Sequence, residues 1–243
     1  GNLVAEAEGT EVSLDVPEMK LWSPDSPVLY DLEISIVRGG ETVDAVKGYT
    51  AMRKISYAKG ADGKHYQMLL NNVPLYQFGP LDQGWWPDGL YTAPSDEALA
   101  FDIERTKEMG FNLIRKHVKV EPARWYWHCD RLGMLVWQDM PSIADNSTNV
   151  WDNRTYNDGT DTPVPEDGKA NYYKEWSEII NAFKTFPCIV AIAVSLTVNV
   201  ALAVWSCVDP SENFSTTVYC CVSPTVKAAI FGEISIPVEI GAQ

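Results

Sequence analysis

Residues 110–141 read GFNLIRKHVKVEPARWYWHCDRLGMLVWQDMP, and this stretch decides the fold. It begins with an apolar strand, Phe111 to Val118, after which a proline opens a helix that extends from Ala123 to Leu132. Gly133 ends that helix, and Met134 to Trp137 form a second short strand. A strand, a helix and a strand in this order predict two parallel strands joined by a crossover helix.

The same alternation continues on both sides of this stretch. Before it, Ser95 can cap a helix that ends near Lys107 and carries two acidic residues in its first turn, where they suit the helix dipole. After it, a helix from about Tyr172 to Thr185 precedes a strand from Ile189 to Val194. The first strand of the series is expected at Leu69 to Phe78. Strands that alternate with helices predict a parallel sheet, either doubly wound or closed into a barrel.

The amino-terminal residues follow a different pattern. Leu32, Ile34 and Ile36 alternate with polar residues, and Gly39-Gly40 then marks a hairpin turn. This pattern predicts an antiparallel sheet. A complete β-sandwich needs about seven strands and roughly 100 residues, so residues 1–57 are expected to form only part of one.

The composition changes after the fourth predicted strand. Between Cys188 and Gly232 only three residues are charged, and from Val194 to Phe231 no helical period is present. One hypothesis is a change of reading frame near Val194, which the nucleotide sequence would decide. The expected regions are a partial sandwich at residues 1–57, an α/β region at residues 58–194 and an atypical low-charge tail at residues 195–243.

The segment from Cys188 to Val208 is long enough to span a bilayer as a helix, and its 21 residues carry no charge. Asn199 lies near its middle, and no cationic cluster flanks it to set an orientation. We therefore expect no membrane span.

The amino-acid composition indicates which classes of protein and partner are compatible with this sequence. The 243 residues are 46% hydrophobic and 21% charged, which is typical of a globular protein with a sizeable core. A formal net charge of −14 disfavours nucleic acid as a partner. Five cysteines are an odd number and define no disulfide framework. The oligomeric state is not determined by these properties.

Common motifs for binding nucleotides, for a serine nucleophile and for binding metals are missing from the sequence. It contains no glycine-rich phosphate loop and no GxSxG string, and its three histidines stand apart from one another. Neither CxxC nor HExxH spacing occurs. We expect no cofactor and no metal.

Side chains at the carboxyl ends of parallel strands form the ligand sites of α/β folds. The residues near these ends combine carboxylates, a histidine, an arginine and indoles. Indole faces stack on sugar rings, while carboxylates and arginine bind hydroxyl groups. The candidate substrate-binding residues are therefore Asp82, Trp85, Trp86, Arg115, His117, Trp137 and Asp139.

Structural roles compete with this interpretation. Asp139 could serve only as the ion-pair partner of Arg115, and His117 could be a packing residue. Trp85 and Trp86 lie in a loop with proline and glycine, which favours ligand contact over core packing.

Three strings in this order resemble the family-2 glycoside hydrolases, the β-galactosidase and β-glucuronidase group. They are LDQGWWPDGLYTAP at 81–94, GFNLIRKH at 110–117 and LVWQDMP at 135–141. The resemblance covers Leu21 to Pro141 and extends more loosely to about Ala193. It implies an immunoglobulin-like β-sandwich followed by a (β/α)8 TIM barrel, here incomplete.

The resemblance also implies hydrolysis of terminal β-glycosides with retention, by an acid/base glutamate in an Asn-Glu pair after the fourth strand and a nucleophilic glutamate at the seventh. In this sequence Ser195 follows the fourth strand and no carboxylate occurs before Asp209. The 179 residues from His65 onward are also fewer than the roughly 250 of a whole barrel. We therefore expect a carbohydrate partner and no catalytic residue in this chain, which would be inactive alone.

An alternative is a non-catalytic carbohydrate-binding or interaction module. Related bacterial enzymes suggest a periplasmic or secreted location.

Overall fold

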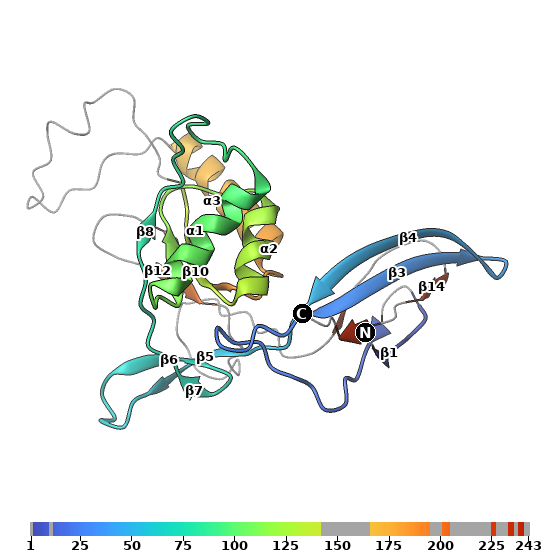
Figure 1. Cartoon of the computed structure of the whole chain (residues 1–243). Coiled ribbons are helices and arrows are strands. Elements are labelled where there is room, and N and C mark those ends of the chain that lie inside the picture. The colour runs from blue at the N-terminus through green and yellow to red at the C-terminus, as the bar shows by residue number, and fades with distance from the viewer. Residues whose placement is uncertain are drawn as a thin grey trace, which may run out of the picture.

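A computed structural model describes residues 2–9, 12–141 and 166–194, together with four short strands after Val194. The side chains of residues 166, 167, 193 and 194 and of those four strands lie outside this description. The described elements form several separate sheets and three helices, an organisation of β and α/β parts (Figure 1).

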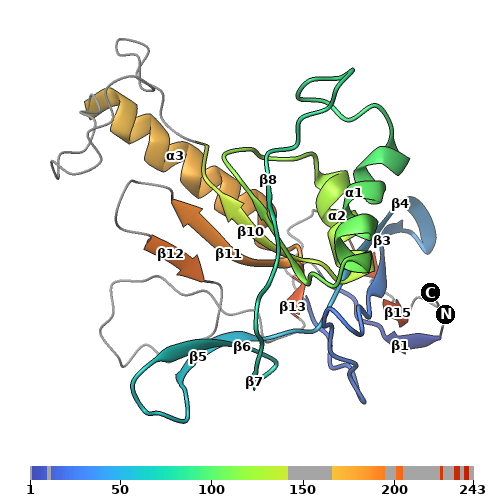
Figure 2. The same ribbon diagram turned by 60° about the vertical axis from the view of Figure 1, so that its left-hand side comes forward.

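The central element is a parallel sheet. Its strands β8 (Leu81–Asp82), β9 (Leu113–Lys116), β10 (Leu135–Asp139) and β11 (Ile189–Val194) are neighbours in that order. All three pairings among them are parallel, and in Figure 2 β10 and β11 lie side by side. Parallel pairing is therefore confirmed for the three predicted strands that correspond to β9, β10 and β11, whereas β8 was not among the predicted strands. Beyond β11 the pairing changes, because β12 (Ala201–Val204) is antiparallel to β11.

Three helices accompany the parallel sheet: α1 (Asp96–Glu108), α2 (Ala123–Leu132) and α3 (Glu166–Phe183). The predicted cap of α1 is confirmed, because the Ser95 hydroxyl accepts a hydrogen bond from the Ala98 amide at 3.2 Å. α2 ends as predicted at Gly133, whose φ of 71° is the left-handed conformation that glycine adopts without strain.

The expected first strand at Leu69–Phe78 is wrong. Strand β6 (Tyr66–Leu70) turns back into β7 (Val73–Pro74), and β5 (Ile55–Lys59) pairs with β6 on its other side. The turn residues Asn71 and Asn72 both have positive φ, 54° and 66°, which is the geometry of a tight hairpin. The parallel sheet therefore starts later, at β8.

The amino-terminal half contains an antiparallel sheet. Its long hairpin of β3 (Tyr30–Arg38) and β4 (Glu41–Thr50) turns at Gly39 and Gly40, with φ of 61° and 83°, so the predicted hairpin is confirmed. The remaining strands of this sheet are β1 (Leu3–Ala5), β14 (Glu233–Ser235) and β15 (Val238–Ile240). A separate two-stranded pair consists of β2 (Val12–Ser13) and β13 (Thr225–Val226). The strands described near the carboxyl end thus pair with those of the amino end.

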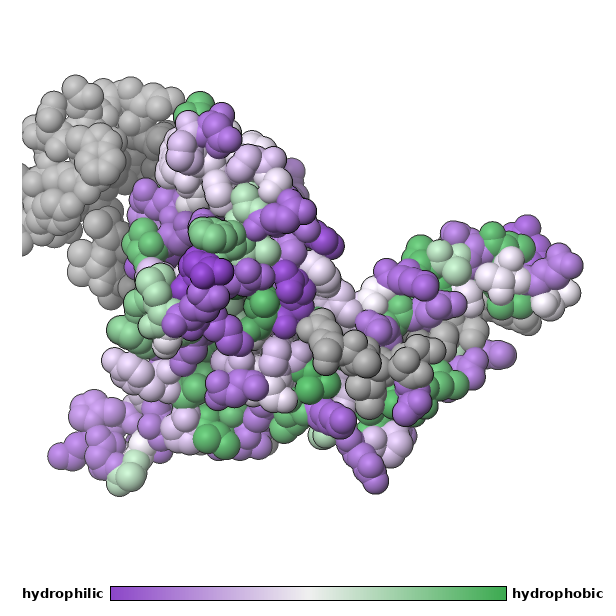
Figure 3. All heavy atoms as spheres, in the orientation of Figure 1, coloured by the Kyte–Doolittle hydropathy of each residue, from purple (hydrophilic) through white to green (hydrophobic). Residues whose placement is uncertain are grey.

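One hydrophobic core joins the parallel sheet to its helices, because Ile103, Ile114, Leu135 and Ile189 are almost completely buried within it. Trp22 extends this core toward the antiparallel sheet and donates its indole N–H to the Asp130 carbonyl oxygen at 2.8 Å. The outer surface over α1 is mostly hydrophilic, as Figure 3 shows.

The three described helices, α1, α2 and α3, differ from a membrane span, which needs about 20 predominantly apolar residues. None of them combines sufficient length with sufficient apolar character to cross a bilayer.

Candidate functional site

Alternation along the strands divides the parallel sheet into two faces. Arg115 lies opposite Trp137 on the neighbouring strand, whereas Lys116 lies opposite both Asp82 and Gln138. Lys116 faces α2, because its ammonium lies 4.3 Å from the ring centre of Trp125. Since successive side chains point to opposite faces, Arg115 lies on the face turned away from α1 and α2, which we call the open face.

An ion pair dominates the open face. The Arg115 Nε and Nη2 atoms donate to both carboxylate oxygens of Asp139 at 2.9 to 3.2 Å, a bidentate geometry. The side chain of Asp139 is fully buried, while that of Arg115 is 38% exposed. Asp139 therefore orients Arg115, and the arginine is the member of the pair that a ligand can reach.

His117 and Trp137 belong to the same face. The Gln83 amide donates to Nδ1 of His117 at 2.9 Å, so in the neutral ring Nε2 carries the hydrogen. The Trp137 indole N–H donates to the side-chain oxygen of Gln77 at 2.5 Å. Arg115, His117 and Trp137 are all half-buried. A guanidinium, an imidazole N–H and an indole thus lie at the carboxyl ends of neighbouring strands.

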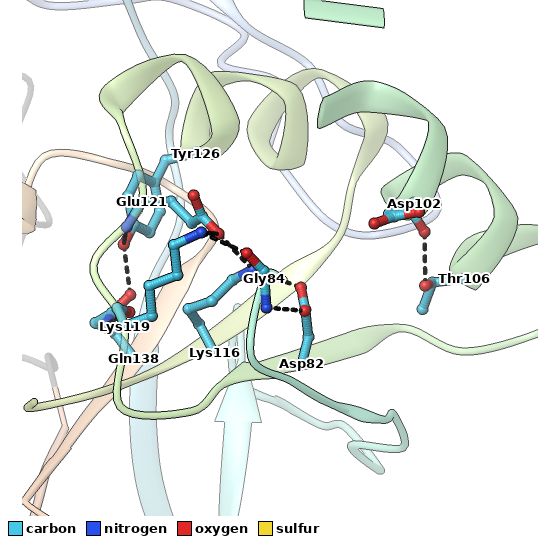
Figure 4. Close-up of polar contacts among 9 residues, drawn as sticks. All are labelled: Asp82, Gly84, Asp102, Thr106, Lys116, Lys119, Glu121, Tyr126 and Gln138. Atoms are coloured by element: carbon cyan, nitrogen blue, oxygen red, sulfur yellow. Dashed lines mark hydrogen bonds and ion pairs between the residues drawn. The ribbon is translucent and has the colours of Figure 1, made fainter. Parts of the chain in front are cut away.

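Asp82 lies on the opposite face, in a buried charge cluster that Figure 4 shows. The Lys116 ammonium is 2.5 Å from Asp82 and 2.9 Å from Glu121, and the Lys119 ammonium is also 2.9 Å from Glu121. The side chains of Lys116, Lys119 and Glu121 are at most 4% exposed. The two ammonium groups and the two carboxylates neutralise each other. This pairing is needed because an unpaired charge is costly to bury.

This cluster holds the loop that follows β8. The Gly84 amide donates to the Asp82 carboxylate at 2.7 Å, and the Gly84 carbonyl accepts from the Lys119 ammonium at 2.7 Å. Gly84 has a φ of 63°, and a Cβ atom there would contact the charged ends of Glu121 and Lys119. A glycine is therefore needed where the backbone meets the cluster.

The two candidate tryptophans of this loop differ in exposure. Trp85 is 61% exposed and meets the Tyr91 ring edge-on at 4.6 Å between ring centres. Trp86 is half-buried, and its backbone exchanges two hydrogen bonds with Leu90 at 2.7 and 2.9 Å.

At the other end of the strands, the Asp130 carboxyl is fully buried. It accepts hydrogen bonds from the Tyr49 hydroxyl at 2.7 Å and from the Cys188 amide at 2.6 Å, just before β11 begins. Burial raises the pKa of Asp130 to about 7. Burial and the nearby carboxylate also raise the pKa of Tyr49 far above its usual value. This end of the sheet joins two parts of the chain, because Arg53 also donates hydrogen bonds there, to the carbonyl oxygens of Pro187 and Ile189.

The sequence-predicted residues are thus only partly brought together. Arg115, His117, Trp137 and Asp139 share the open face, Asp82 lies on the helix-facing side, and the two loop tryptophans lie beyond the end of β8. The ion pair between Asp139 and Arg115, considered as the structural alternative, is present.

The candidate residues taken from the sequence leave out two glutamines, and the pairing of charges in the cluster was not predicted. Gln77 and Gln83 orient Trp137 and His117, and Gln77 lies in a segment expected to be a strand. Successive side chains of a strand point to opposite faces of the sheet. Once the pairing of Asp82 with Lys116 is known, this alternation predicts that both lie on the face opposite Arg115.

No group of three or more histidine, cysteine, aspartate or glutamate side chains in the described part of the chain is arranged to hold a metal ion. The open face can bind a polar ligand by arginine and imidazole donors, and the indole offers an apolar surface for a sugar ring.

Comparison with known proteins gives relatives among the glycosidases. A model of the family described as glycosyl hydrolases family 2 matches residues 1–53. A beta-galactosidase of Lactococcus lactis is 30% identical over 163 residues, which are 67% of this chain and 15% of that protein. A beta-galactosidase of Leuconostoc mesenteroides is 30% identical over 142 residues, or 56% of this chain and 13% of that protein. The chain therefore spans about one seventh of the length of these relatives.

Solved structures give a similar result. A beta-glucuronidase of Bacteroides uniformis superposes with a TM-score of 0.57 at 26% identity, over 74% of this chain and 19% of the other. An FMN-binding beta-glucuronidase from Facaelibacterium prausnitzii L2-6 superposes with a TM-score of 0.56 at 26% identity, over 74% of this chain and 24% of the other.

Proposed function

The chain is related to the family-2 glycosyl hydrolases over part of its length, and from this premise we propose that its open face binds the terminal sugar of a β-glycoside. The parallel sheet would then be the first part of a (β/α)8 barrel, and the antiparallel sheet part of an immunoglobulin-like sandwich. The relationship supports a glycoside hydrolase-like function for the parent fold.

The observation that carries this proposal is the bidentate pair of Arg115 and Asp139. It holds a half-exposed guanidinium at the carboxyl end of the sheet, beside the indole of Trp137. The guanidinium would donate to sugar hydroxyl or carboxylate oxygens, His117 would add a donor, and the indole would cover an apolar sugar face.

We further propose that these 243 residues bind the sugar and do not cleave it. Hydrolysis with retention requires two carboxyl groups about 5 Å apart on either side of the scissile bond. On the open face the carboxylate of Asp139 is buried behind Arg115, and no acid occurs in the sequence from Cys188 until Asp209. The chain then acts as a carbohydrate-binding unit, and its location is proposed to be periplasmic or secreted.

The test combines binding and turnover. Calorimetry with methyl β-galactoside and methyl β-glucuronide is expected to detect binding of one of them, and the corresponding nitrophenyl glycosides are expected to remain intact. Arg115→Lys should weaken binding about tenfold, because lysine cannot make the bidentate contact. Arg105→Lys is the matched control, since Arg105 pairs with the exposed Glu108 and contacts the Phe101 ring, both within α1.

Two results would contradict the proposal. Equal affinity in the Arg115→Lys protein would exclude the open face as the site. Release of nitrophenol that disappears in an Asp139→Asn or Glu121→Gln variant would show that a carboxylate pair is present after all.

A further inference from the structure

Two of the five cysteines lie in the main hydrophobic core, where the proposed function does not use them. Cys129 belongs to the second half of α2, and Cys188 immediately precedes β11. Both are free thiols, and both are fully buried. A free cysteine in a core packs as a small apolar residue. Two cysteines that the fold brings together can also be joined covalently.

Cys188 is held against the turn of α2 that contains Cys129. Its thiol donates a hydrogen bond to the carbonyl oxygen of Tyr126 at 3.6 Å, and its backbone amide donates to the Asp130 carboxylate at 2.6 Å. Tyr126 precedes Cys129 by three residues and lies on the same side of the helix, whereas Asp130 follows it directly. The two thiol groups also interact with each other. The two sulfur atoms are therefore neighbours across the contact between α2 and the start of β11.

The environment of the two thiols determines when they can react. Burial raises the pKa of both Cys129 and Cys188. Because the thiolate is the nucleophile in thiol–disulfide exchange, buried thiols of raised pKa react slowly. The folded and reduced protein should therefore resist oxidation. During folding the same thiols still meet water, and an external disulfide can reach them.

We propose that Cys129 and Cys188 form a disulfide bond while the chain folds in the presence of a small-molecule disulfide such as oxidised glutathione. The thiolate of one cysteine attacks the glutathione disulfide, which releases one glutathione and leaves a mixed disulfide. The thiolate of the other cysteine then attacks the protein sulfur of this mixed disulfide and releases the second glutathione. Two protein thiols are thereby oxidised, one glutathione disulfide is reduced, and the two protons end on the two glutathione thiols.

The bond would join α2 to the residue before β11. It would strengthen the contact in which Asp130 receives hydrogen bonds from Tyr49 and Cys188. Disulfides persist in oxidising compartments, which agrees with the proposed periplasmic or secreted location. The inference does not depend on sugar binding, because the open-face residues lie at the carboxyl ends of the strands and Cys188 lies before the amino end of β11.

Peptide mapping of the full 243-residue chain tests the bond directly. The reduced chain is unfolded in urea, refolded in a glutathione redox buffer, alkylated and digested with chymotrypsin without reduction. Cleavage after aromatic residues places Cys129 in the peptide 128–137 and Cys188 within 184–205, apart from the three later cysteines. We expect these two peptides to be linked, with a mass two hydrogen atoms below their sum. This link should exceed every other linkage of Cys129 by about tenfold.

Urea denaturation tests whether the bond stabilises the folded chain. It would close a loop of about 60 residues, which restricts the unfolded state. The equilibrium constant of unfolding should therefore be roughly 30- to 900-fold smaller in the oxidised than in the reduced protein. Cys188→Ser should remove this difference, while its hydroxyl can still donate to Tyr126. Cys221→Ser is the matched control, because it removes a cysteine outside the pair and should keep the difference.

Each outcome decides the proposal. A predominant link between Cys129 and Cys188, together with the expected difference in stability, supports it. Refolded protein in which both cysteines are alkylated contradicts it, as does a Cys129 peptide linked mainly to one of the three later cysteines. A link that leaves the unfolding equilibrium unchanged would overturn the role of the bond in joining α2 to β11.

Discussion

Asp139 and Asp130 are both fully buried, and they lie at opposite ends of the parallel strands. At the carboxyl end, Asp139 forms a bidentate ion pair with an arginine that is partly open to solvent. At the amino end, Asp130 receives hydrogen bonds from a hydroxyl and a backbone amide, and burial raises its pKa to about 7. The first environment keeps a charged group within reach of a ligand, whereas the second favours a neutral carboxyl that joins two parts of the chain. The two aspartates thus differ because one meets a partly exposed cation and the other meets neutral hydrogen-bond donors.

The largest expected effect would come from breaking the charge balance at the carboxyl end. Glu121→Gln leaves Lys119 buried without an anionic partner, while Lys116 keeps Asp82. Loss of one partner from a buried ion pair costs about 3–5 kcal/mol. Urea denaturation should show a decrease of this size in the free energy of unfolding.

Glu108→Gln is the matched control for Glu121→Gln. Glu108 pairs with Arg105 on the exposed side of α1, so its loss should cost less than about 1 kcal/mol. Similar costs for both variants would mean that the cluster is solvated and does not hold the loop.

At the amino end of the sheet, Asp130 should make the free energy of unfolding depend on pH. The pKa of Asp130 is raised from 3.8 to about 7, so between pH 4 and 7 the folded state retains a proton that the unfolded state has released. This contribution to stability is fully present below pH 4 and is lost as the pH rises through 7, for a change of up to about 4 kcal/mol. Asp130→Asn should flatten this dependence, as measured by urea denaturation across the range.

Glu97→Gln provides the comparison for the pH series. Hydrogen bonds from its own backbone amide and from the Ser95 hydroxyl hold the pKa of Glu97 below its usual value, so it stays ionised in the folded state throughout this window. Its replacement should leave the slope between pH 5 and 7 as it is in the original protein. A stability curve that rises toward pH 7 in the original protein would contradict a neutral Asp130.

The smallest expected effect is a difference in glycoside affinity between the variants of Asp139 and Asp130. Asp139→Asn should weaken binding of the preferred methyl glycoside about tenfold, because the guanidinium of Arg115 loses its anionic partner and its fixed orientation. Asp130→Asn should leave the affinity unchanged, as calorimetry on both variants at pH 6 would show. Equal losses would remove the distinction between the two ends of the sheet.

Much of the local structure could be predicted from residues near one another in the chain. Ser95 and Gly133 marked helix ends, and Gly39-Gly40 marked a hairpin, because a cap or a tight turn depends on only a few neighbouring residues. The prediction failed at Asn71-Asn72, where two consecutive positive φ values turned an expected strand into a hairpin. Asparagine tolerates that conformation, but a pair of asparagines does not require it.

The sequence by itself determined the alternation of strands and helices, the placement of Arg115, His117, Trp137 and Asp139 near strand ends and the chemistry suited to a sugar. Only the tertiary structure decided that Asp82 faces the helices, that Lys119 holds the loop after β8 and that Asp130 is buried against Tyr49. The physical reason is the separation along the chain over which each interaction acts. Helix propensities and caps depend on a few neighbouring residues. The face that a side chain occupies and the charge that it contacts depend on pairing between segments about 30 to 80 residues apart.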